Sequence, residues 1–266
     1  MFHHGYVFQT MLAEAGLLSD DKVRQHQTMQ LIYGVNRPFR IRLNNEWHKV
    51  RFCLLDVAVP HYISGDGDWQ YCFYIYPDSH TGHLLKSTVL KDSAVSVFSR
   101  EDRFAGANII PSVVRPIAPF ELKQLFEQVI FLFTGKESRM RPDQPLIQEL
   151  RKHMLEKDIF SSKGLAELCG MGMEELSGQF KRITEFSLES WLLHQRLMVF
   201  FERLEKQELL SDNVVDSLTR QSGIAGLDGL DRLFLDLFGI PYRKWTNSTV
   251  GSIILTDRQE EFPCFI

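Results

Sequence analysis

The chain has 266 residues, 44% of them hydrophobic and 24% charged, which is long enough for two ordinary domains, each with a hydrophobic core. Its net charge is −4, so the chain does not have the overall positive charge of many nucleic-acid-binding proteins. No window reaches the ~18 unbroken apolar residues of a membrane helix. The first residues lack the basic start of a secretory signal. The four cysteines, Cys53, Cys72, Cys169 and Cys264, are scattered without a CxxC pair, which argues against a disulfide scaffold or a structural zinc site and favours a reducing cytoplasm.

Residues 28–100 have the pattern of short β-strands separated by turns. In FRIRLN, at 39–44, apolar and polar residues alternate with the period of two that is typical of a half-buried strand. Asn44 and Asn45 predict a hairpin turn into the next strand. The turn cluster SGDGD, at 64–68, precedes the aromatic strand WQYCFYIYP, which ends at a proline. Together these strands predict a small antiparallel barrel or jelly roll.

The aromatic strand is the first candidate for a binding site. Side chains alternate along a strand, which gives two aromatic faces, with Trp69, Tyr71 and Phe73 on one and Tyr74 and Tyr76 on the other. Such a set could line a small-molecule pocket, with His61 or Tyr62 as a polar contact. The alternative is that these aromatic residues fill the core.

Four histidines lie in the strand-rich half: His48, His61, His80 and His83. None belongs to a close HxH pair followed by a carboxylate, which would suggest a metal-binding barrel. We expect His80 and His83, in HTGH, to lie in a loop. We therefore expect no bound metal and no cofactor.

A helical period begins after Pro119 and ends at Gly135. The segment places six large apolar residues on one stripe: Leu122, Leu125, Phe126, Val129, Ile130 and Phe133. The stripe could pack against the chain's own strands or form a dimer seam. We favour a dimer seam through Leu122, Leu125, Phe126, Val129 and Phe133, because Leu132 extends the apolar surface beyond one narrow face.

The polar segment GKESRMRPDQPL, at 135–146, contains two prolines and no apolar period, as expected for an interdomain linker. The residues that come after it have a helical pattern throughout. We therefore expect an N-terminal domain over 1–134, a helical domain over 147–248 and a tail of unknown role over 249–266.

The stretch LAELCGMGMEELSGQFKRI, at 165–183, predicts two short helices that meet at a glycine turn. Ser161 or Ser162 could cap the first helix. Three apolar residues would bury the second: Leu176, Phe180 and Ile183. Many pairs of antiparallel helices share this pattern, so it is a weak signal by itself.

The residues after this stretch make the pattern more specific. A long amphipathic helix is expected over 187–207, with Ser187 as its N-cap, and SLTRQSGIAGLDGLDRLFLDLFGIPYRKW, at 217–245, repeats the two-helix pattern around Gly223. Two such units joined by one helix resemble the DNA-binding region of the AraC/XylS family of bacterial transcription regulators, over about 150–246. The matching positions are LAELCGM, Leu176, Phe180-Lys181, Trp191 through Arg196-Leu197, Gly223-Ile224, Leu230, Phe234, Phe238-Gly239, Pro241 and Trp245-Thr246.

The resemblance implies an α+β fold: an N-terminal cupin-like β-barrel or jelly roll, matched by strand pattern and by VPHYIS at 59–64, and a C-terminal all-α domain with two helix-turn-helix units. The second helix of each unit, here about 173–184 and 226–238, would lie in a DNA major groove, with the two groove faces roughly 34 Å apart. We call these two helices the reading helices.

Several residues depart from what a DNA reader needs. The first reading helix begins with Glu174 and Glu175, and residues 150–248 contain 13 Lys and Arg against 15 Asp and Glu. A carboxylate can accept a hydrogen bond from cytosine N4, but it otherwise repels phosphate. We expect DNA contacts from nine residues: Lys163, Glu174, Glu175, Ser177, Lys181, Arg182, Arg196, Arg232 and Arg243.

The chain contains no nucleophile–base motif, phosphate-binding loop or dinucleotide fingerprint, so we expect no enzyme. The favoured hypothesis is a cytoplasmic transcription regulator that binds double-stranded DNA. We expect it to form a homodimer and to have no membrane partner. RNA polymerase and a small-molecule effector or regulatory protein would be its further partners. The alternative is the same architecture acting mainly through protein contacts with weak or no DNA binding. A metal-dependent cupin enzyme comes third.

Overall fold

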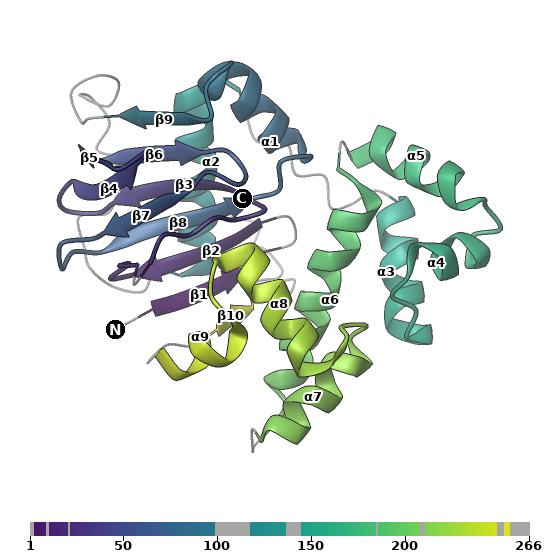
Figure 1. Cartoon of the computed structure of the whole chain (residues 1–266). Coiled ribbons are helices and arrows are strands. Elements are labelled where there is room, and N and C mark those ends of the chain that lie inside the picture. The colour runs from purple at the N-terminus through teal and green to yellow at the C-terminus, as the bar shows by residue number, and fades with distance from the viewer. Residues whose placement is uncertain are drawn as a thin grey trace, which may run out of the picture.

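The chain forms an α+β fold, with strands in the N-terminal half and helices in the C-terminal half (Figure 1). The structure is a computed structural model and describes residues 3–8, 11–20, 22–98, 118–136, 145–184, 186–207, 211–248 and 253–255. Within these ranges, none of the helices combines the length and the apolar character required to cross a bilayer.

The strands form two sheets. The larger has the order β10-β1-β2-β8-β3-β6-β9, with bounds β1 His3–Val7, β2 Met11–Gly16, β3 Met29–Gly34, β6 Phe52–Leu55, β8 Gln70–Ile75, β9 Val95–Phe98 and β10 Ile253–Leu255. The smaller has the order β5-β4-β7, with bounds β4 Phe39–Leu43, β5 Glu46–Val50 and β7 His61–Ser64. Neighbouring strands are antiparallel except β10, which runs parallel to β1 and lies in the predicted tail.

Both predicted turns between strands are confirmed. Asn44 and Asn45 have φ angles of 49° and 67° and connect β4 to β5, with Leu43 opposite Glu46. Two consecutive residues at positive φ give a hairpin whose twist matches that of its strands, and asparagine tolerates this conformation. The turn at 64–68 connects β7 to β8.

The two sheets pack against each other through apolar residues. Their common cluster includes Ile32 and Cys72 of the larger sheet and Ile41 and Ile63 of the smaller one. Period-two alternation along each strand supplies this face, because every second side chain points the same way.

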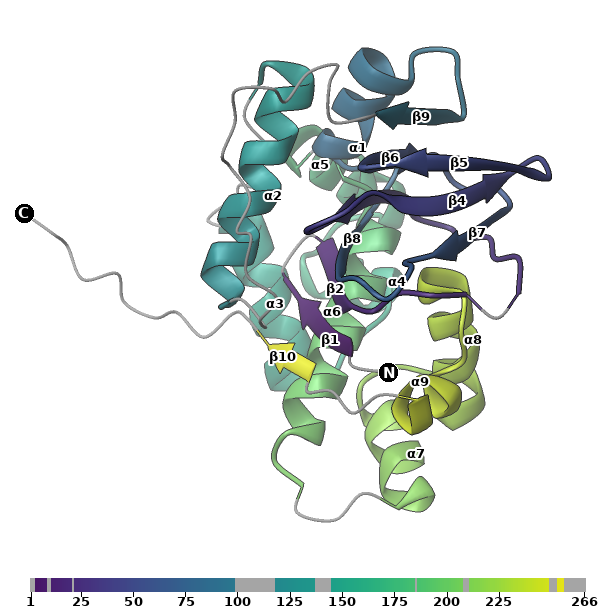
Figure 2. The ribbon, with the colours of Figure 1, turned by 90° about the vertical axis from the view of Figure 1, so that its left-hand side faces the viewer.

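Helix α2 (Pro119–Thr134) covers the opposite face of the larger sheet (Figure 2) and ends, as predicted, at Gly135 with φ of 68°. The Phe126 ring centroid lies 5.1 Å from that of Phe73 on β8. The predicted dimer contacts are all buried within the chain itself: Leu122, Leu125, Phe126, Val129 and Phe133. The dimer-seam prediction is therefore wrong for these residues, because covering the apolar face of the sheet uses the whole stripe.

The predicted loop at HTGH is also wrong, because His80 and His83 lie on helix α1 (His80–Leu85). Ser79 caps this helix: its Oγ accepts a hydrogen bond from the Gly82 N–H at 3.0 Å. A short π-helical segment, η1 (Lys86–Leu90), comes next. The Ser79 cap stabilises the start of α1, a helix that the short apolar pattern of these residues did not predict.

The described C-terminal half is helical, with α3 Pro145–Lys157, α4 Ser162–Leu168, α5 Met173–Thr184, α6 Leu188–Leu204, α7 Asp212–Gln221, α8 Gly226–Phe238 and α9 Tyr242–Ser248. Ser161 caps α4 and Ser187 caps α6, each Oγ accepting an N–H at 3.1 Å. The predicted reading helices are α5 and α8, and α6 runs between the two helix pairs (Figure 1).

The N-terminal and C-terminal halves share part of one hydrophobic core. The cluster between the sheets continues into the helices. Tyr76 lies 5.2 Å from Phe186, centroid to centroid, and Tyr74 lies 4.9 Å from Phe238 at the end of α8. Most of the predicted linker, 135–146, lies outside the described residues.

This shared core predicts that loss of one helical side chain weakens the strands as well. We expect Phe238→Ala to lower the free energy of unfolding by about 3 kcal/mol, because it removes a buried ring that packs on Tyr74. Phe131→Ala on α2, where the ring is 52% exposed, should change it by less than about 0.5 kcal/mol. Urea unfolding gives the free energies, and hydrogen exchange should show reduced protection in β8. Unchanged protection in β8 would show that the halves unfold separately.

Candidate nucleic-acid interface

The first helix pair consists of α4 and α5 joined by a tight turn at Gly170, whose φ is 65°. Leu165 and Ala166 on α4 are buried, as are Leu176 and Phe180 on α5, so the two helices meet through apolar faces. Such a positive φ is readily adopted by glycine because it has no Cβ. The turn therefore holds α5 with its other face exposed.

The exposed face of α5 has acidic residues at its start and basic residues at its end. Glu174 and Glu175 occupy the first turn, Lys181 and Arg182 the last, and Ser177 between them is half-buried. Glu174 and Lys181 are seven residues apart, or about 10 Å along the helix. Carboxylates are stabilised at a helix N-terminus and cations at its C-terminus. The acidic start therefore stabilises α5, while the basic end offers the better contact for phosphate.

Contrary to the sequence prediction, Ile183 on α5 is not part of the buried face, since it is 36% exposed. It comes directly after the two basic residues in the last turn of the helix. The contacts of α5 with α4 and α6 are made instead by Leu176 and Phe180, and the Phe180 ring centroid lies 5.2 Å from that of Trp191 on α6.

The second helix pair, α7 and α8, is joined by a turn in which Gly223 has φ of 75° and Gly226 has φ of 72°. Asp216 on α7 fixes the start of α8: its Oδ1 accepts from the Leu227 N–H at 2.7 Å, and its Oδ2 binds Arg220 at 2.9 Å. The Leu227 N–H also lowers the pKa of the Asp216 carboxyl. The helix pair is thus held by a side-chain cap as well as by apolar packing.

The outer face of α8 offers little positive charge. Arg243 on α9 binds Asp228 at 2.7 Å and also pairs with Asp231, and both carboxylates raise the pKa of Arg243. Arg232 is exposed on α8, near an exposed Leu235. The predicted role of Arg243 as a DNA contact is therefore a poor fit, because its guanidinium is already held by two carboxylates.

Arg196 is also unsuited to DNA contact. Its guanidinium is half-buried on α6 and donates two hydrogen bonds to the Phe160 carbonyl, one of them from Nε at 3.0 Å. Burial lowers its pKa. Arg196 thus positions the residues before α4. Among the described residues, the predicted basic contacts that stay exposed and without an ion pair are Lys163, Lys181, Arg182 and Arg232.

The predicted pocket residues are not brought together. Tyr71 and Phe73 are buried beneath α2, with Trp69 packed against the same cluster. His61 is buried on the other side of the strands, whereas Tyr62 is turned away from it and lies 5.2 Å beneath Arg42. Neighbouring residues on a strand point to opposite faces, and both faces of β8 are covered, so these aromatic residues fill the core.

Residues of the N-terminal half cap the end of α8. The last carbonyl groups of a helix have no partner within the helix. Here the Asp236 carbonyl accepts from the Gln27 N–H at 2.9 Å. The Leu237 carbonyl accepts from the Thr28 hydroxyl at 3.4 Å and lies 3.1 Å from Nδ1 of His26. Together with α8, these residues form what we call the α8 junction.

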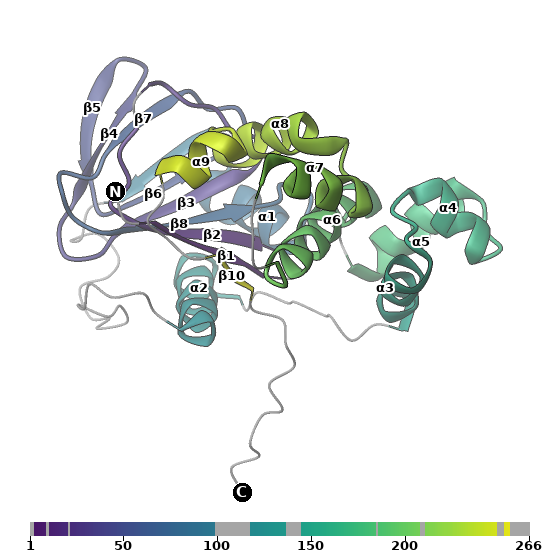
Figure 3. The same ribbon diagram turned by 90° about the horizontal axis from the view of Figure 1, so that it is seen from below.

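The α8 junction is closely packed. Gly239, with φ of 70°, comes directly after α8, and a Cβ there would lie 2.8 Å from Cε1 of His26. The His26 ring stacks on His61 at 5.2 Å, and the Tyr74 ring is 5.7 Å away. No local pattern in the sequence indicated this contact, because His26 and Leu237 are 211 positions apart. Figure 3 shows α7–α9 beside the sheets and α3–α5 set apart from them.

No protein-family model matches the chain, and no curated protein sequence matches it. Among solved structures, it is similar to ToxT from Vibrio cholerae O395, with 10% identity, a TM-score of 0.42 and coverage of 91% of this chain and 98% of that chain. It is also similar to wild-type ToxT from Vibrio cholerae strain SCE256 with a bound unsaturated fatty acid, at 8% identity, a TM-score of 0.43 and coverage of 93% and 99%.

A third similar structure is the AraC-like transcriptional activator CuxR, at 8% identity, with a TM-score of 0.26 and coverage of 81% of this chain and 83% of that chain. TM-scores this low at such identities assign no function.

The buried histidines predict that the chain loses stability in mild acid. Burial lowers the pKa of His26 to about 3 and that of His194 to about 4, and it also lowers the pKa of His61. Below pH ~6.5 the unfolded chain binds protons at these rings and the folded chain does not, so the free energy of unfolding falls as pH decreases toward 4. Each ring contributes up to about 1.4 kcal/mol per pH unit.

Urea unfolding at several pH values between about 7 and 5 measures this slope. We expect His26→Gln to reduce the slope of the unfolding free energy against pH by an amount equivalent to about one proton taken up on unfolding, because the variant has no imidazole to protonate at this position. The control is His83→Gln, which changes an exposed histidine. An equal slope in wild type and His26→Gln would contradict the prediction.

Proposed function

We propose that this chain is a DNA-binding transcription regulator of the AraC/XylS type. The observation that supports the proposal is the presence of two helix pairs, α4–α5 and α7–α8, each with a left-handed glycine in its turn and both connected through α6. This arrangement of helices agrees with the positions in the sequence that resemble the AraC/XylS family. The helical domain would span 147–248 and bind DNA in the cytoplasm, with RNA polymerase as a further partner.

The first unit is the main DNA contact in this proposal. Lys181 and Arg182 are exposed at the end of α5, and Lys163 is exposed on α4. Among the described residues none of these three has an ion pair, so each can neutralise a phosphate without first losing a partner. Ser177 can donate to a base or a phosphate, and Glu174 or Glu175 can accept from cytosine N4.

The second unit connects the helical domain to the N-terminal one. The α8 junction connects the reading helix of this unit to residues 26–28, and Arg243 pairs with Asp228 and Asp231 on the same helix. We propose that the N-terminal domain, residues 1–134, is a cupin-like sensing domain, and that an effector or regulatory protein acts on α8 through this junction. These features also favour the alternative function, in which the chain acts mainly through protein contacts.

Reversing the charge at the end of α5 tests the DNA-binding proposal. We expect Lys181→Glu with Arg182→Glu to weaken binding to a duplex selected from a random pool by at least about tenfold and to reduce the slope of log affinity against log salt by about 2, because two phosphate contacts are lost. Fluorescence anisotropy at several salt concentrations measures both quantities.

The matched control is Lys49→Glu with Lys91→Glu, which makes the same change in net charge at exposed positions of the N-terminal half. This control should keep most of the affinity and the full slope. Equal weakening by both double variants would indicate a general charge effect. No weakening by either would leave the first unit without DNA contact and support the protein-contact alternative.

A second pair of variants compares the two units. Glu174→Gln with Glu175→Gln removes two negative charges from α5, and Asp228→Asn with Asp231→Asn removes two from α8. We expect the first pair to raise non-specific DNA affinity several-fold and the second to change it by less than about twofold, because α5 faces the phosphates. Anisotropy with a random duplex measures both. A larger gain from the α8 variants would mean that α8, not α5, lies closer to DNA.

A further inference from the structure

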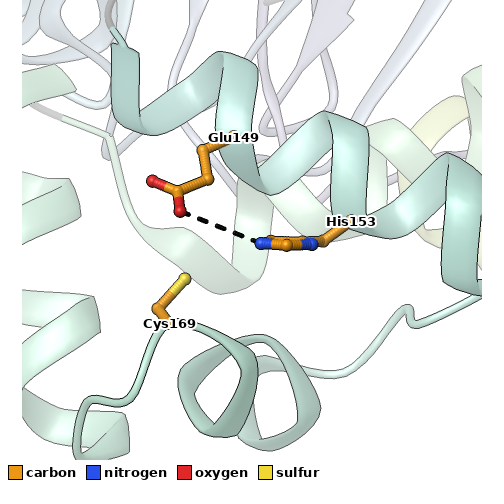
Figure 4. Close-up of side chains that lie close together, drawn as sticks. All are labelled: Glu149, His153 and Cys169. Atoms are coloured by element: carbon orange, nitrogen blue, oxygen red, sulfur yellow. Dashed lines mark ion pairs between the residues drawn. The ribbon is translucent and has the colours of Figure 1, made fainter.

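A group of metal-ligating side chains lies between α3 and the end of α4 (Figure 4). Glu149 and His153 are four positions apart on α3, so they lie on the same face of that helix. Cys169 is the C-cap residue of α4. One ligand atom from each residue lies within 4.8 Å of the other two.

His153 has no hydrogen-bond partner to account for its burial. Its side chain is 19% exposed, and its Nε2 lies 3.8 Å from Oε1 of Glu149, beyond hydrogen-bond distance. Its Nδ1 is buried without a partner among the described residues. Nε2 is the ring nitrogen that faces Glu149, so a cation at this cluster would bind Nε2 and leave Nδ1 to carry the N–H.

The three ligand types indicate the class of metal. A thiolate, an imidazole and a carboxylate together suit Zn²⁺ or a similar first-row divalent ion, whereas Mg²⁺ and Ca²⁺ prefer oxygen ligands. Tetrahedral Zn²⁺ with bonds of about 2.0–2.3 Å places its ligand atoms ~3.5 Å apart. Nε2 of His153 and Oε1 of Glu149 are already 3.8 Å apart, so the remaining adjustment of about 1 Å falls on Sγ of Cys169.

We propose that Glu149, His153 and Cys169 form a binding site for Zn²⁺ or a related divalent transition metal, with water as the fourth ligand. The ion binds Nε2 of His153, a carboxylate oxygen of Glu149 and the Sγ thiolate of Cys169, and the thiol proton leaves to solvent. Bound there, the ion joins α3 to the residue that begins the turn between α4 and α5. It thereby stabilises the first helix pair. The site does not depend on DNA binding.

Cobalt substitution in the full chain tests this site. Co²⁺ added to metal-free protein should bind at one ion per chain, with intense visible bands of tetrahedral geometry and a near-ultraviolet thiolate-to-cobalt band. We expect Cys169→Ser to abolish the thiolate band, and His153→Gln or Glu149→Gln to weaken binding by at least about tenfold. Zn²⁺ should displace Co²⁺ and raise the melting temperature of the wild type but not that of Cys169→Ser.

The matched controls are Cys264→Ser, which removes a thiol near the end of the chain, and His80→Gln with His83→Gln, which removes two histidines from α1. Both should keep the bands and the affinity. Circular dichroism confirms that each variant is folded, and the exposed position of Glu149 makes Glu149→Gln the variant least prone to misfold. Absence of a thiolate band in the wild type, or its persistence in Cys169→Ser, would overturn the proposal.

Discussion

The carbonyl groups at the end of α8 accept hydrogen bonds from residues near the start of the chain, and the arrangement of the two halves depends on this contact. Gln27, Thr28 and His26 provide the cap that the helix cannot provide for itself. His26 sits under the end of α8, where only a glycine at 239 leaves room for its ring. Separating α8 from the strands would expose unpaired carbonyls and a buried histidine together, which is energetically costly.

The two helix pairs consequently differ in what constrains them. The pair α7–α8 is held by the α8 junction and by the Asp216 cap, and it lies beside the sheets (Figure 3). The pair α4–α5 packs on α3 and α6 and stands apart from the sheets, with its basic residues exposed. In the proposed function, α4–α5 contacts DNA and α7–α8 connects the helices to the N-terminal half. A metal ion at Cys169 would act on α4–α5 alone.

Local signals in the sequence predicted local structure well. Ser161, Ser187 and Gly135 mark helix ends, and Asn44-Asn45 marks a hairpin, because caps and turns are decided by a few neighbouring residues. The site was harder to predict. The sequence shows Arg196 and Arg243 as basic residues but does not show their partners. In the structure Arg196 binds a distant carbonyl, and Arg243 binds two carboxylates. The Glu149–His153 spacing was visible in the sequence, but Cys169 joins them only through the packing of α4 on α3.

The cap on α8 also limits whether the two halves of such a chain can be exchanged between proteins. Two-domain regulators are often pictured as a sensor and a reader that could be exchanged between proteins. In this chain the end of α8 is capped by residues of the N-terminal half, and His194 of α6 contacts the Tyr76 hydroxyl and the Phe8 carbonyl as well. A C-terminal half joined to a different N-terminal half would lack the hydrogen-bond donors for the last carbonyls of α8. The two halves can therefore be exchanged between proteins only where residues 26–28 are supplied or replaced.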